Sequence, residues 1–198
     1  MPMLLSLQIL LFMMPVILGG VTNMIFVKLP FVRKHRRPMD AGRYWRDGKR
    51  IFGDNKTWYG FMGMILFTAC WFAAMGWLVD HWTWLKSNSL LPWDTYNTPY
   101  TEWMIGMLWG FSYVLFELPN SFIKRRLNIP PGQNRKGWLG ICFTVIDQAD
   151  SVIGCMIATY LFYQPTILEA ALFLLIGTAV HYIINILLYL TGLKQQAG

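Results

Sequence analysis

Asp147 and Asp150 are the residues in this chain whose type and setting point most clearly to chemistry. They lie inside an otherwise apolar segment of membrane-spanning length, Trp138–Tyr163. A carboxylate in hydrocarbon costs on the order of 3 kcal/mol, so such groups are rare and usually functional. Three residues apart on a helix, the two side chains point the same way. Two carboxylates on one face, near cations, suit a divalent metal that carries a polyphosphate.

A basic run, Lys124-Arg125-Arg126, precedes the aspartates along the chain. Ser121 is placed to cap a short helix that carries this run, and a helix N-terminus beside cations binds anions. The alternative is a juxtamembrane anchor for anionic lipid head groups. For the aspartates, the alternative is a structural contact between helices, or a salt bridge to Arg125 or Lys56. Because the basic run and the aspartates lie near each other in sequence, we favour phosphate and metal binding.

The composition indicates an integral membrane protein. The chain has 198 residues, of which 55% are hydrophobic, and its mean hydropathy is +0.38. Charged residues make up 14%, against roughly 25% in a soluble domain. The 10 Trp, 9 Tyr and 13 Phe fit the same class, because aromatic rings favour the membrane interfaces. No two of the three cysteines form a CxxC pair, so neither a disulfide framework nor a zinc site is indicated.

Apolar segments long enough to span a bilayer, which takes about 20 helical residues, recur five times along the chain. We therefore predict an all-α, polytopic fold with a single membrane domain, residues 1–198. The last two segments are joined by little more than Gln164-Pro165, which predicts a tight antiparallel hairpin. The five predicted transmembrane helices lie near Met3–Val27, Trp58–Val79, Glu102–Leu118, Trp138–Tyr163 and Thr166–Leu190.

The placement of basic residues predicts the orientation. Of the 17 basic residues, ten lie in the first loop, residues 28–57, and five in the third, residues 119–137. With five spans these two loops share one side, which the positive-inside rule makes cytoplasmic. We therefore expect a plasma-membrane protein with its N-terminus outside, its C-terminus inside and its site facing the cytoplasm. The second loop, residues 80–101, reads as an outer cap on the membrane surface.

The first loop also carries acidic turns. Asp40, Asp47-Gly48 and Gly53-Asp54 each sit in a turn-forming setting. An ordered basic loop can present backbone N–H groups and lysines to an anion. The alternative is that the basic loops serve topology alone, but a topology signal does not need ordered turns.

Several other polar or small residues have both structural and functional interpretations. Glu117 is expected to pair with a loop cation. Asn23 either caps a helix or reaches the site, and His181 with Asn185 is expected to form an interhelical hydrogen-bonding pair. The pattern Gly106-Met-Leu-Trp-Gly110 suits close helix packing or a homodimer.

Together these motifs resemble the signature of the CTP-dependent phospholipid cytidylyltransferases: Ser121-x-x-Lys124-Arg125, then a loop, then Asp147 and Asp150. Within that superfamily the chain looks most similar to the CDP-archaeol synthase family, and the resemblance covers most of residues 20–155. The phosphatidate enzymes carry a His-Gly-Gly element and an Arg between the aspartates, where this chain has Gln148. Further segments that carry the resemblance are Asn23-Met24, Pro38-Met39-Asp40-Ala41-Gly42, the stretch 47–57 and Pro119-Asn120.

The resemblance implies that CTP and a membrane lipid phosphate give a CDP-activated lipid and pyrophosphate, with Mg²⁺ as cofactor. Asp147 and Asp150 would hold the metal and act in catalysis with Lys124 and Arg125. The acceptor is left open between an ether lipid, a diacyl lipid and an isoprenoid phosphate, and no nucleic-acid partner is expected. The residues implied to bind CTP or the lipid phosphate are Asn23, Asp47, Gly48, Gly53, Asp54, Lys56, Ser121, Lys124, Arg125 and Arg126.

Two other classes of protein compete with this interpretation. A small transporter subunit usually places polar groups near the midplane and often shows inverted repeats; here no repeat is evident and the polar groups gather toward one face. A non-catalytic membrane protein that binds lipid head groups would keep the basic loops but would not need the aspartate pair.

Overall fold

The computed structural model describes residues 2–96, 98–133 and 137–194. In these ranges the chain forms eight helices and no strand, with isolated antiparallel bridges only at Pro38–Thr57 and Tyr44–Arg50. The all-α class predicted from the sequence is therefore confirmed. Arg135 and Lys136, which belong to the predicted third loop, lie outside the described residues.

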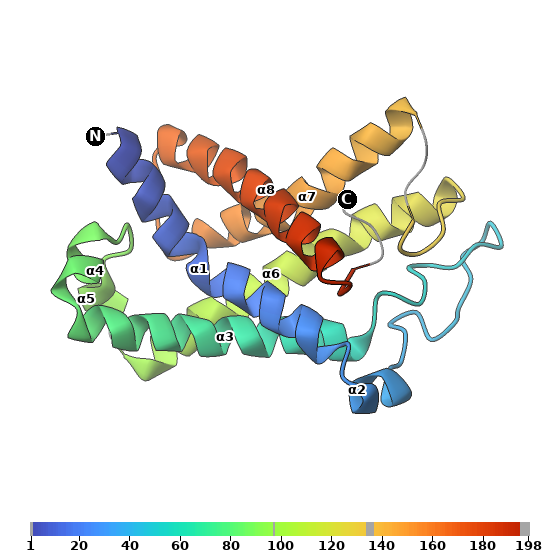
Figure 1. The fold of residues 1–198 in the computed structure, drawn as a ribbon, viewed down its shortest axis with the longest axis horizontal. Coiled ribbons are helices and arrows are strands. Elements are labelled where there is room, and N and C mark those ends of the chain that lie inside the picture. The colour runs from blue at the N-terminus through green and yellow to red at the C-terminus, as the bar shows by residue number, and fades with distance from the viewer. Residues whose placement is uncertain (1, 97, 134–136, 195–198) are drawn as a thin grey trace.

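Long helices run between the two ends of the molecule (Figure 1). The chain alternates direction along them, so the residues after α1 and the residues after α6 meet at the same end, opposite the short helices α4 and α5. The long helices are α1 (Pro2–Phe26), α3 (Trp58–His81), α6 (Pro99–Arg126), α7 (Trp138–Thr159) and α8 (Ile167–Leu190); the short ones are α2 (Pro30–His35), α4 (Thr83–Asn88) and α5 (Trp93–Tyr96).

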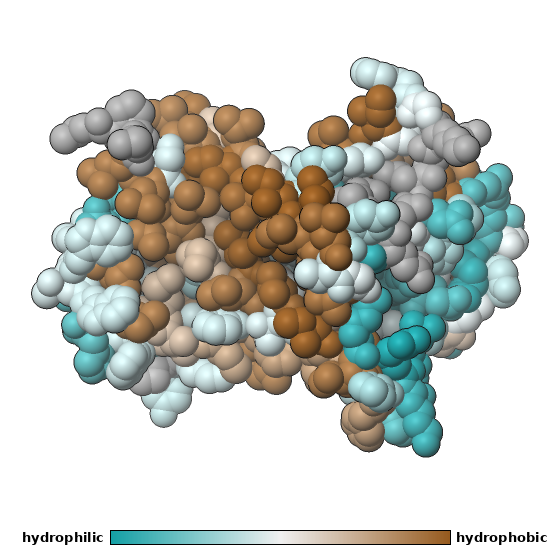
Figure 2. Space-filling view, in the orientation of Figure 1, coloured by the Kyte–Doolittle hydropathy of each residue, from teal (hydrophilic) through white to brown (hydrophobic). Residues whose placement is uncertain are grey.

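Four stretches of the described chain are long and apolar enough to cross a membrane: Leu4–Phe26, α3, α7 and α8. Apolar side chains form a broad zone in the middle of the face drawn in Figure 2, and hydrophilic side chains gather at the end that carries the basic loops. A multi-pass membrane protein is thus confirmed. Helix α6 has 28 residues but is less apolar, since it contains Glu102, Glu117 and a basic last turn. A fifth span and the orientation of the termini remain predictions.

Helix α6 corrects one expectation. The third span was predicted to end near Leu118, with Ser121 capping a separate short helix. Instead α6 continues through Pro119 to Arg126, so Ser121 lies in its interior and caps no helix. Proline lacks a backbone N–H, but neighbouring helices let membrane helices tolerate it. The unbroken helix aligns Glu117, Asn120 and Lys124 on one face, because residues three and four apart lie on the same side.

Glycines allow α6 to approach α3 closely. A Cβ atom on Gly106 would lie 2.6 Å from the Ala69 Cα, and one on Gly110 would lie 2.7 Å from the Ile65 Cα. Trp109, between the two glycines, is fully buried and donates from Nε1 to the Thr159 hydroxyl at 3.1 Å, which ties α6 to α7. The Gly106/Gly110 pair therefore packs helices within one chain. The homodimer remains a prediction, and it would have to form through a surface other than the one that contains Gly106 and Gly110.

A glycine also sets the distance between α6 and α7. A Cβ atom on Gly154 would lie 2.5 Å from the Ser112 carbonyl oxygen on α6. Gly154 follows Asp150 by one helical turn. The close approach therefore brings the acidic stretch of α7 against the polar face of α6.

Replacing Gly110 with alanine should destabilise the bundle. The added methyl group meets the Ile65 backbone, which cannot move aside as a flexible side chain can, and overpacking of this kind typically costs about 1–3 kcal/mol. Thermal unfolding of the purified protein in detergent should show a lower midpoint for Gly110→Ala. The control is Gly20→Ala, whose Cβ would meet only the Met64 Cε at 3.9 Å. Equal midpoints for the two variants would contradict this account of the α3–α6 contact.

Candidate functional site

The centre of the candidate site is an amide held between two carboxylates. Asn120 on α6 donates from Nδ2 to the Asp147 Oδ1 at 2.7 Å and to the Asp150 Oδ2 at 2.8 Å. Lys124, one turn further along α6, forms an ion pair with the other Asp147 oxygen. Both aspartates therefore face α6. From the sequence, Arg125 or Lys56 was considered as the salt-bridge partner of the aspartates, but the structure shows Lys124 in that role.

A second ion pair joins the first loop to α6. Lys56 contacts the Glu117 carboxylate, which confirms that Glu117 pairs with a loop cation. Burial by itself would lower the pKa of the Lys56 ammonium, but the Glu117 carboxylate raises it, with Asp150 and Asp147 adding to the effect, and the net shift is upward. Lys56 is therefore held in its charged form. The next residue, Thr57, caps α3 by accepting from the Gly60 N–H at 3.2 Å.

The first loop is folded around the carboxylate of Asp40. Arg50 donates to it from Nε at 3.2 Å and from Nη2 at 2.7 Å. The backbone N–H groups of Gly42, Phe52 and Gly53 donate to it at 3.1, 3.0 and 2.9 Å. Burial alone would raise the pKa of Asp40, but these hydrogen bonds together hold it below its usual range. The sequence showed a turn at Asp40 but gave no sign that it organises the loop.

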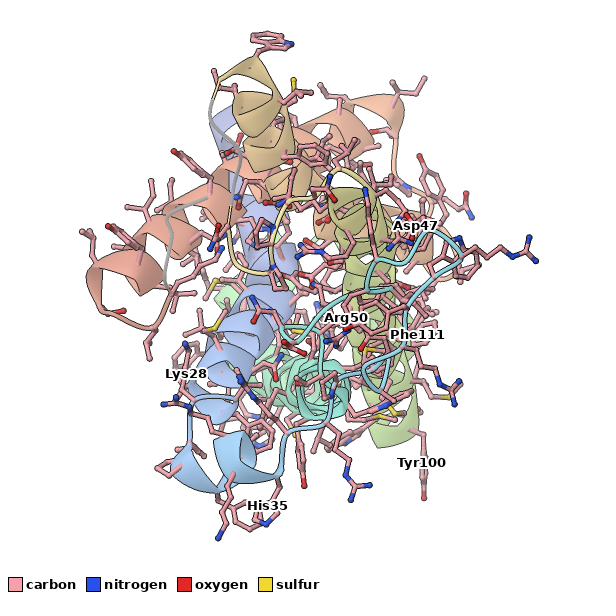
Figure 3. The ribbon with its side chains drawn as sticks, turned by 90° about the vertical axis from the view of Figure 1, so that its right-hand side faces the viewer. Lys28, His35, Asp47, Arg50, Tyr100 and Phe111 are labelled. Atoms are coloured by element: carbon pink, nitrogen blue, oxygen red, sulfur yellow. The ribbon has the colours of Figure 1, made fainter. Side chains whose placement is uncertain are left out.

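The Asp47-Gly48 turn and Arg126 fasten the loop to the end of α6. The Asp47 Oδ2 lies 2.8 Å from the Arg126 Nε, and the Lys49 ammonium donates to the Arg126 carbonyl oxygen at 2.6 Å. The Arg126 guanidinium also lies over the Phe122 ring, 4.4 Å from its centroid. In Figure 3, Asp47 lies on the outer part of the loop, far from Lys28. These residues support the site and do not line it.

A cavity of about 830 Å³ opens beside the aspartates. Its apolar walls come mainly from α1 and α8, where Val16, Ile17, Val180 and Ile184 line it. Asp47, Gly48, Gly53 and Arg126 do not line it. The polar residues that line the cavity include Asn23, Asp54, Lys56, Glu117, Asn120, Ser121, Lys124, Arg125, Asp147 and Asp150.

Several buried polar atoms in the cavity wall lack a partner within the described part of the chain. They include the Arg125 Nε and Nη1, the Asn23 Oδ1 and the Asn120 Oδ1. Asn23 uses its amide nitrogen to donate to the Gly60 carbonyl oxygen at 2.9 Å, so it joins α1 to α3. Buried polar groups are rarely left unpaired unless a ligand or water satisfies them. The Arg125 guanidinium is therefore the most clearly available anion-binding group.

A polar layer behind the aspartates holds α7 in place. His181 on α8 lies with Nε2 3.0 Å from the Tyr113 hydroxyl on α6 and with Nδ1 3.1 Å from the Gln148 carbonyl oxygen. Asn185 donates to the Gln148 side chain. The predicted interhelical pair of His181 and Asn185 is confirmed. Gln148 and Tyr113 were missed because their partners lie on other helices.

The donor set fits a magnesium ion bound together with a nucleotide. The described residues hold no group of three or more His, Cys, Asp or Glu side chains that could bind a metal. Magnesium usually takes one or two carboxylates and completes its shell with phosphate oxygens and water. Asp147 and Asp150, which both line the cavity, supply such a pair. Zinc, which needs three or four protein ligands, does not fit.

Comparisons with known proteins agree with this picture. Residues 2–197 match the family model described as CarS-like, CDP-archaeol synthase. The CDP-archaeol synthase of Pyrococcus furiosus is 31% identical over 175 residues, covering 88% of this chain and 83% of the relative. That of Thermococcus gammatolerans is 37% identical over 163 residues, covering 80% and 81%.

A solved structure of an intramembrane enzyme for archaeal membrane lipid biosynthesis shares the fold. It has a TM-score of 0.58 and 23% sequence identity, and the match covers 91% of this chain and 94% of that one. The apolar helices and the family match together identify a multi-pass membrane enzyme. The chain belongs to the CDP-archaeol synthase family.

Replacing Asp40 with asparagine should loosen the first loop. Because the pKa of Asp40 is lower in the folded protein than its ordinary 3.8, its carboxylate stabilises the loop above that pH and loses this effect as the pH falls through the folded value. Hydrogen exchange at pH 7 should show lost protection over residues 38–57 in Asp40→Asn, and the difference from the parent should narrow below pH 3.8.

The control is Asp54→Asn, which removes a more exposed carboxylate with a single Arg50 contact at 2.9 Å. It should change protection much less. Equal losses in the two variants would mean that Asp40 does not organise the loop.

Proposed function

We propose that this protein transfers the cytidylyl group of CTP to a lipid phosphate, giving a CDP-activated lipid and pyrophosphate with Mg²⁺. The name of its relatives, CDP-archaeol synthase, makes an archaeol-type ether lipid phosphate the preferred acceptor. We expect Asp147 and Asp150 to hold the metal. This pair is also the feature that a non-catalytic head-group binder would not need.

The observation that carries the proposal is that one cavity has a charged end and an apolar wall. A lipid phosphate combines a charged head with hydrocarbon tails, so it fits both parts at once. A nucleotide needs only the charged end and access from water. A transporter would instead place its polar groups near the midplane, whereas here they gather toward the end that carries the basic loops.

The proposed reaction needs no covalent intermediate. An oxygen of the lipid phosphate attacks the α-phosphorus of CTP, a new P–O bond forms, and the bond to the β-phosphate oxygen breaks to release pyrophosphate. The attacking oxygen is already anionic at neutral pH, so no general base is required. Positioning and charge stabilisation supply the rate in phosphoryl and nucleotidyl transfer.

Each charged group at the centre has a role in this scheme. When bound, Mg²⁺ would neutralise phosphate charge and orient the triphosphate. Asn120 keeps both carboxylates turned toward the cavity, and Lys124 presents its ammonium beside Asp147. The unpaired N–H groups of Arg125 bind phosphate oxygens. Lys56, fixed on Glu117, adds positive charge at the same end.

The proposal also assigns the topology. With α6 as a fifth span, both basic loops are cytoplasmic, the N-terminus is outside and the C-terminus is inside. The distribution of Lys and Arg supports this orientation. The exposed Trp77, Trp82 and Trp84 fit a second membrane interface at the opposite end, because tryptophan favours both interfaces. CTP is cytosolic, so this orientation gives it direct access to the site.

Turnover tests the proposal directly. Purified protein in detergent should release pyrophosphate and form a CDP-lipid only when CTP, Mg²⁺ and a lipid phosphate are all present. A panel of an archaeol-type phosphate, a phosphatidate and an isoprenoid phosphate, assayed side by side, identifies the acceptor. No product with any member of the panel would refute the function, and product with phosphatidate alone would refute the ether-lipid acceptor.

Asp150→Asn should lower kcat by about a hundredfold or more while the protein keeps its thermal midpoint, because the metal site loses one of two carboxylates. Raising the Mg²⁺ concentration should not restore full activity. The control is Asp94→Asn at the opposite end, where a well-exposed carboxylate pairs with Lys86. Parent-like turnover in Asp150→Asn would remove this residue from the metal site.

A further inference from the structure

Three cations at the junction of α1 and α2 line the cavity but belong to none of the groups described above. Lys28, Arg33 and Arg36 are exposed and face the same cavity as the aspartates. Within the described ranges, none of the three forms an ion pair with an acidic side chain. Their charge is therefore available to a ligand.

The backbone fixes these cations at the cavity wall. Helix α2 begins at Pro30, and the Arg33 N–H donates to the Leu29 carbonyl oxygen at 2.9 Å. Val32, between the lining cations, is buried and lines the same cavity. Lys34 and Arg37 belong to the same stretch but do not line the cavity. The basic residues of the stretch 28–37 thus form two sets: Lys28, Arg33 and Arg36 line the cavity, and Lys34 and Arg37 do not.

Apolar side chains beside these cations indicate the level of the membrane surface. Ile25, Leu29 and Phe31 are 48%, 47% and 67% exposed. Ile25 lies in the last turn of the membrane-spanning stretch Leu4–Phe26, and Leu29 and Phe31 follow it closely. Exposed apolar residues next to lysines and arginines are typical of a segment that lies in the head-group region. Lys28, Arg33 and Arg36 are therefore placed between that region and the cavity.

The proposed reaction brings two anions together, and each needs its own positive charge. The last turns of α6 carry Lys124 and Arg125 near the aspartates, on the side suited to a metal–triphosphate. Helix α2 lies at a different corner of the same end, away from the end of α6 in both ribbon views, where Lys28 marks the end of α1 (Figures 1 and 3). The cations of α2 and its flanking residues, which lie beside the exposed apolar side chains, are suited to the second anion, the lipid phosphate.

We infer that Lys28, Arg33 and Arg36 form a head-group subsite that binds the phosphate of the acceptor lipid as it enters from the bilayer. This assignment rests on the proposed function, since it divides two anionic reactants between two sides of one cavity. The expected ligand of this subsite is a phosphate with attached hydrocarbon chains, because the neighbouring exposed surface is apolar.

The test compares two double variants that remove equal charge from the same stretch. Arg33→Gln/Arg36→Gln removes two lining cations, and Lys34→Gln/Arg37→Gln removes two cations that do not line the cavity. In neutral detergent micelles, the first should raise the KM for the lipid phosphate about tenfold, as expected for losing two charge-assisted contacts. Its KM for CTP and its kcat should stay within about twofold of the parent, and the second double variant should match the parent throughout.

Other results overturn the inference. A rise in the KM for CTP with an unchanged KM for lipid would assign the corner to the nucleotide. Equal effects of the two double variants would mean that there is no specific subsite and that the basic surface only attracts the micelle in a general way.

A binding measurement separates failure of the subsite from failure of the proposed function. If the parent makes no CDP-lipid, the proposed function is wrong. Direct binding of lipid phosphate in the same micelles still tests the subsite, because only Arg33→Gln/Arg36→Gln should weaken that binding. Glycerol phosphate, measured in parallel, has the anion without the tails. If the parent binds it as tightly as the lipid, the corner is a free-phosphate site and the assignment to a lipid is wrong.

Discussion

The amide of Asn120 between Asp147 and Asp150 is the contact on which the rest of the site depends. Two carboxylates one helical turn apart repel each other, and a membrane interior makes their ionised forms costly. One donor group that serves both, with Lys124 on the second oxygen of Asp147, lets them stay side by side. The contacts that bring α6 to α7 at this level therefore help to form the candidate site.

Two features of the helices bring Asn120 within hydrogen-bonding distance of the two aspartates. Helix α6 runs unbroken through Pro119, so Glu117, Asn120 and Lys124 share a face. Gly154 lets α7 approach the Ser112 backbone one turn beyond Asp150. Behind them, His181 and Asn185 bond to α7 from α8, so the acidic turn is held from both sides. Contacts from three helices thus fix the position of the acidic turn, which suits a reaction driven by positioning.

The loops complete the charge balance. Folding around Asp40 brings Lys56 to Glu117, while Lys124 pairs with Asp147. Arg125 keeps buried N–H groups that find no partner among the residues the structure describes, so the cavity retains binding capacity for an anion after its internal pairs have formed. Because the same cavity continues between apolar side chains of α1 and α8, an enzyme of this family can bring a water-soluble nucleotide to a lipid that keeps its tails in the bilayer.

Hydropathy and helical periodicity are local properties, so the amino-acid pattern predicted the helical class, the location of four apolar spans and the spacing that puts two aspartates on one helix face. The pairing of Glu117 with a cation and the interhelical bonds of His181 and Asn185 were also foreseen, since buried polar groups need partners. Which partners these groups find depends on how the helices pack in three dimensions. The tertiary structure placed Asn120 between the aspartates, made Asp40 the centre of the first loop, and moved Asp47 and Arg126 away from the cavity. These contacts join residues far apart in the chain, and the packing of whole helices, which no local pattern encodes, sets their distances.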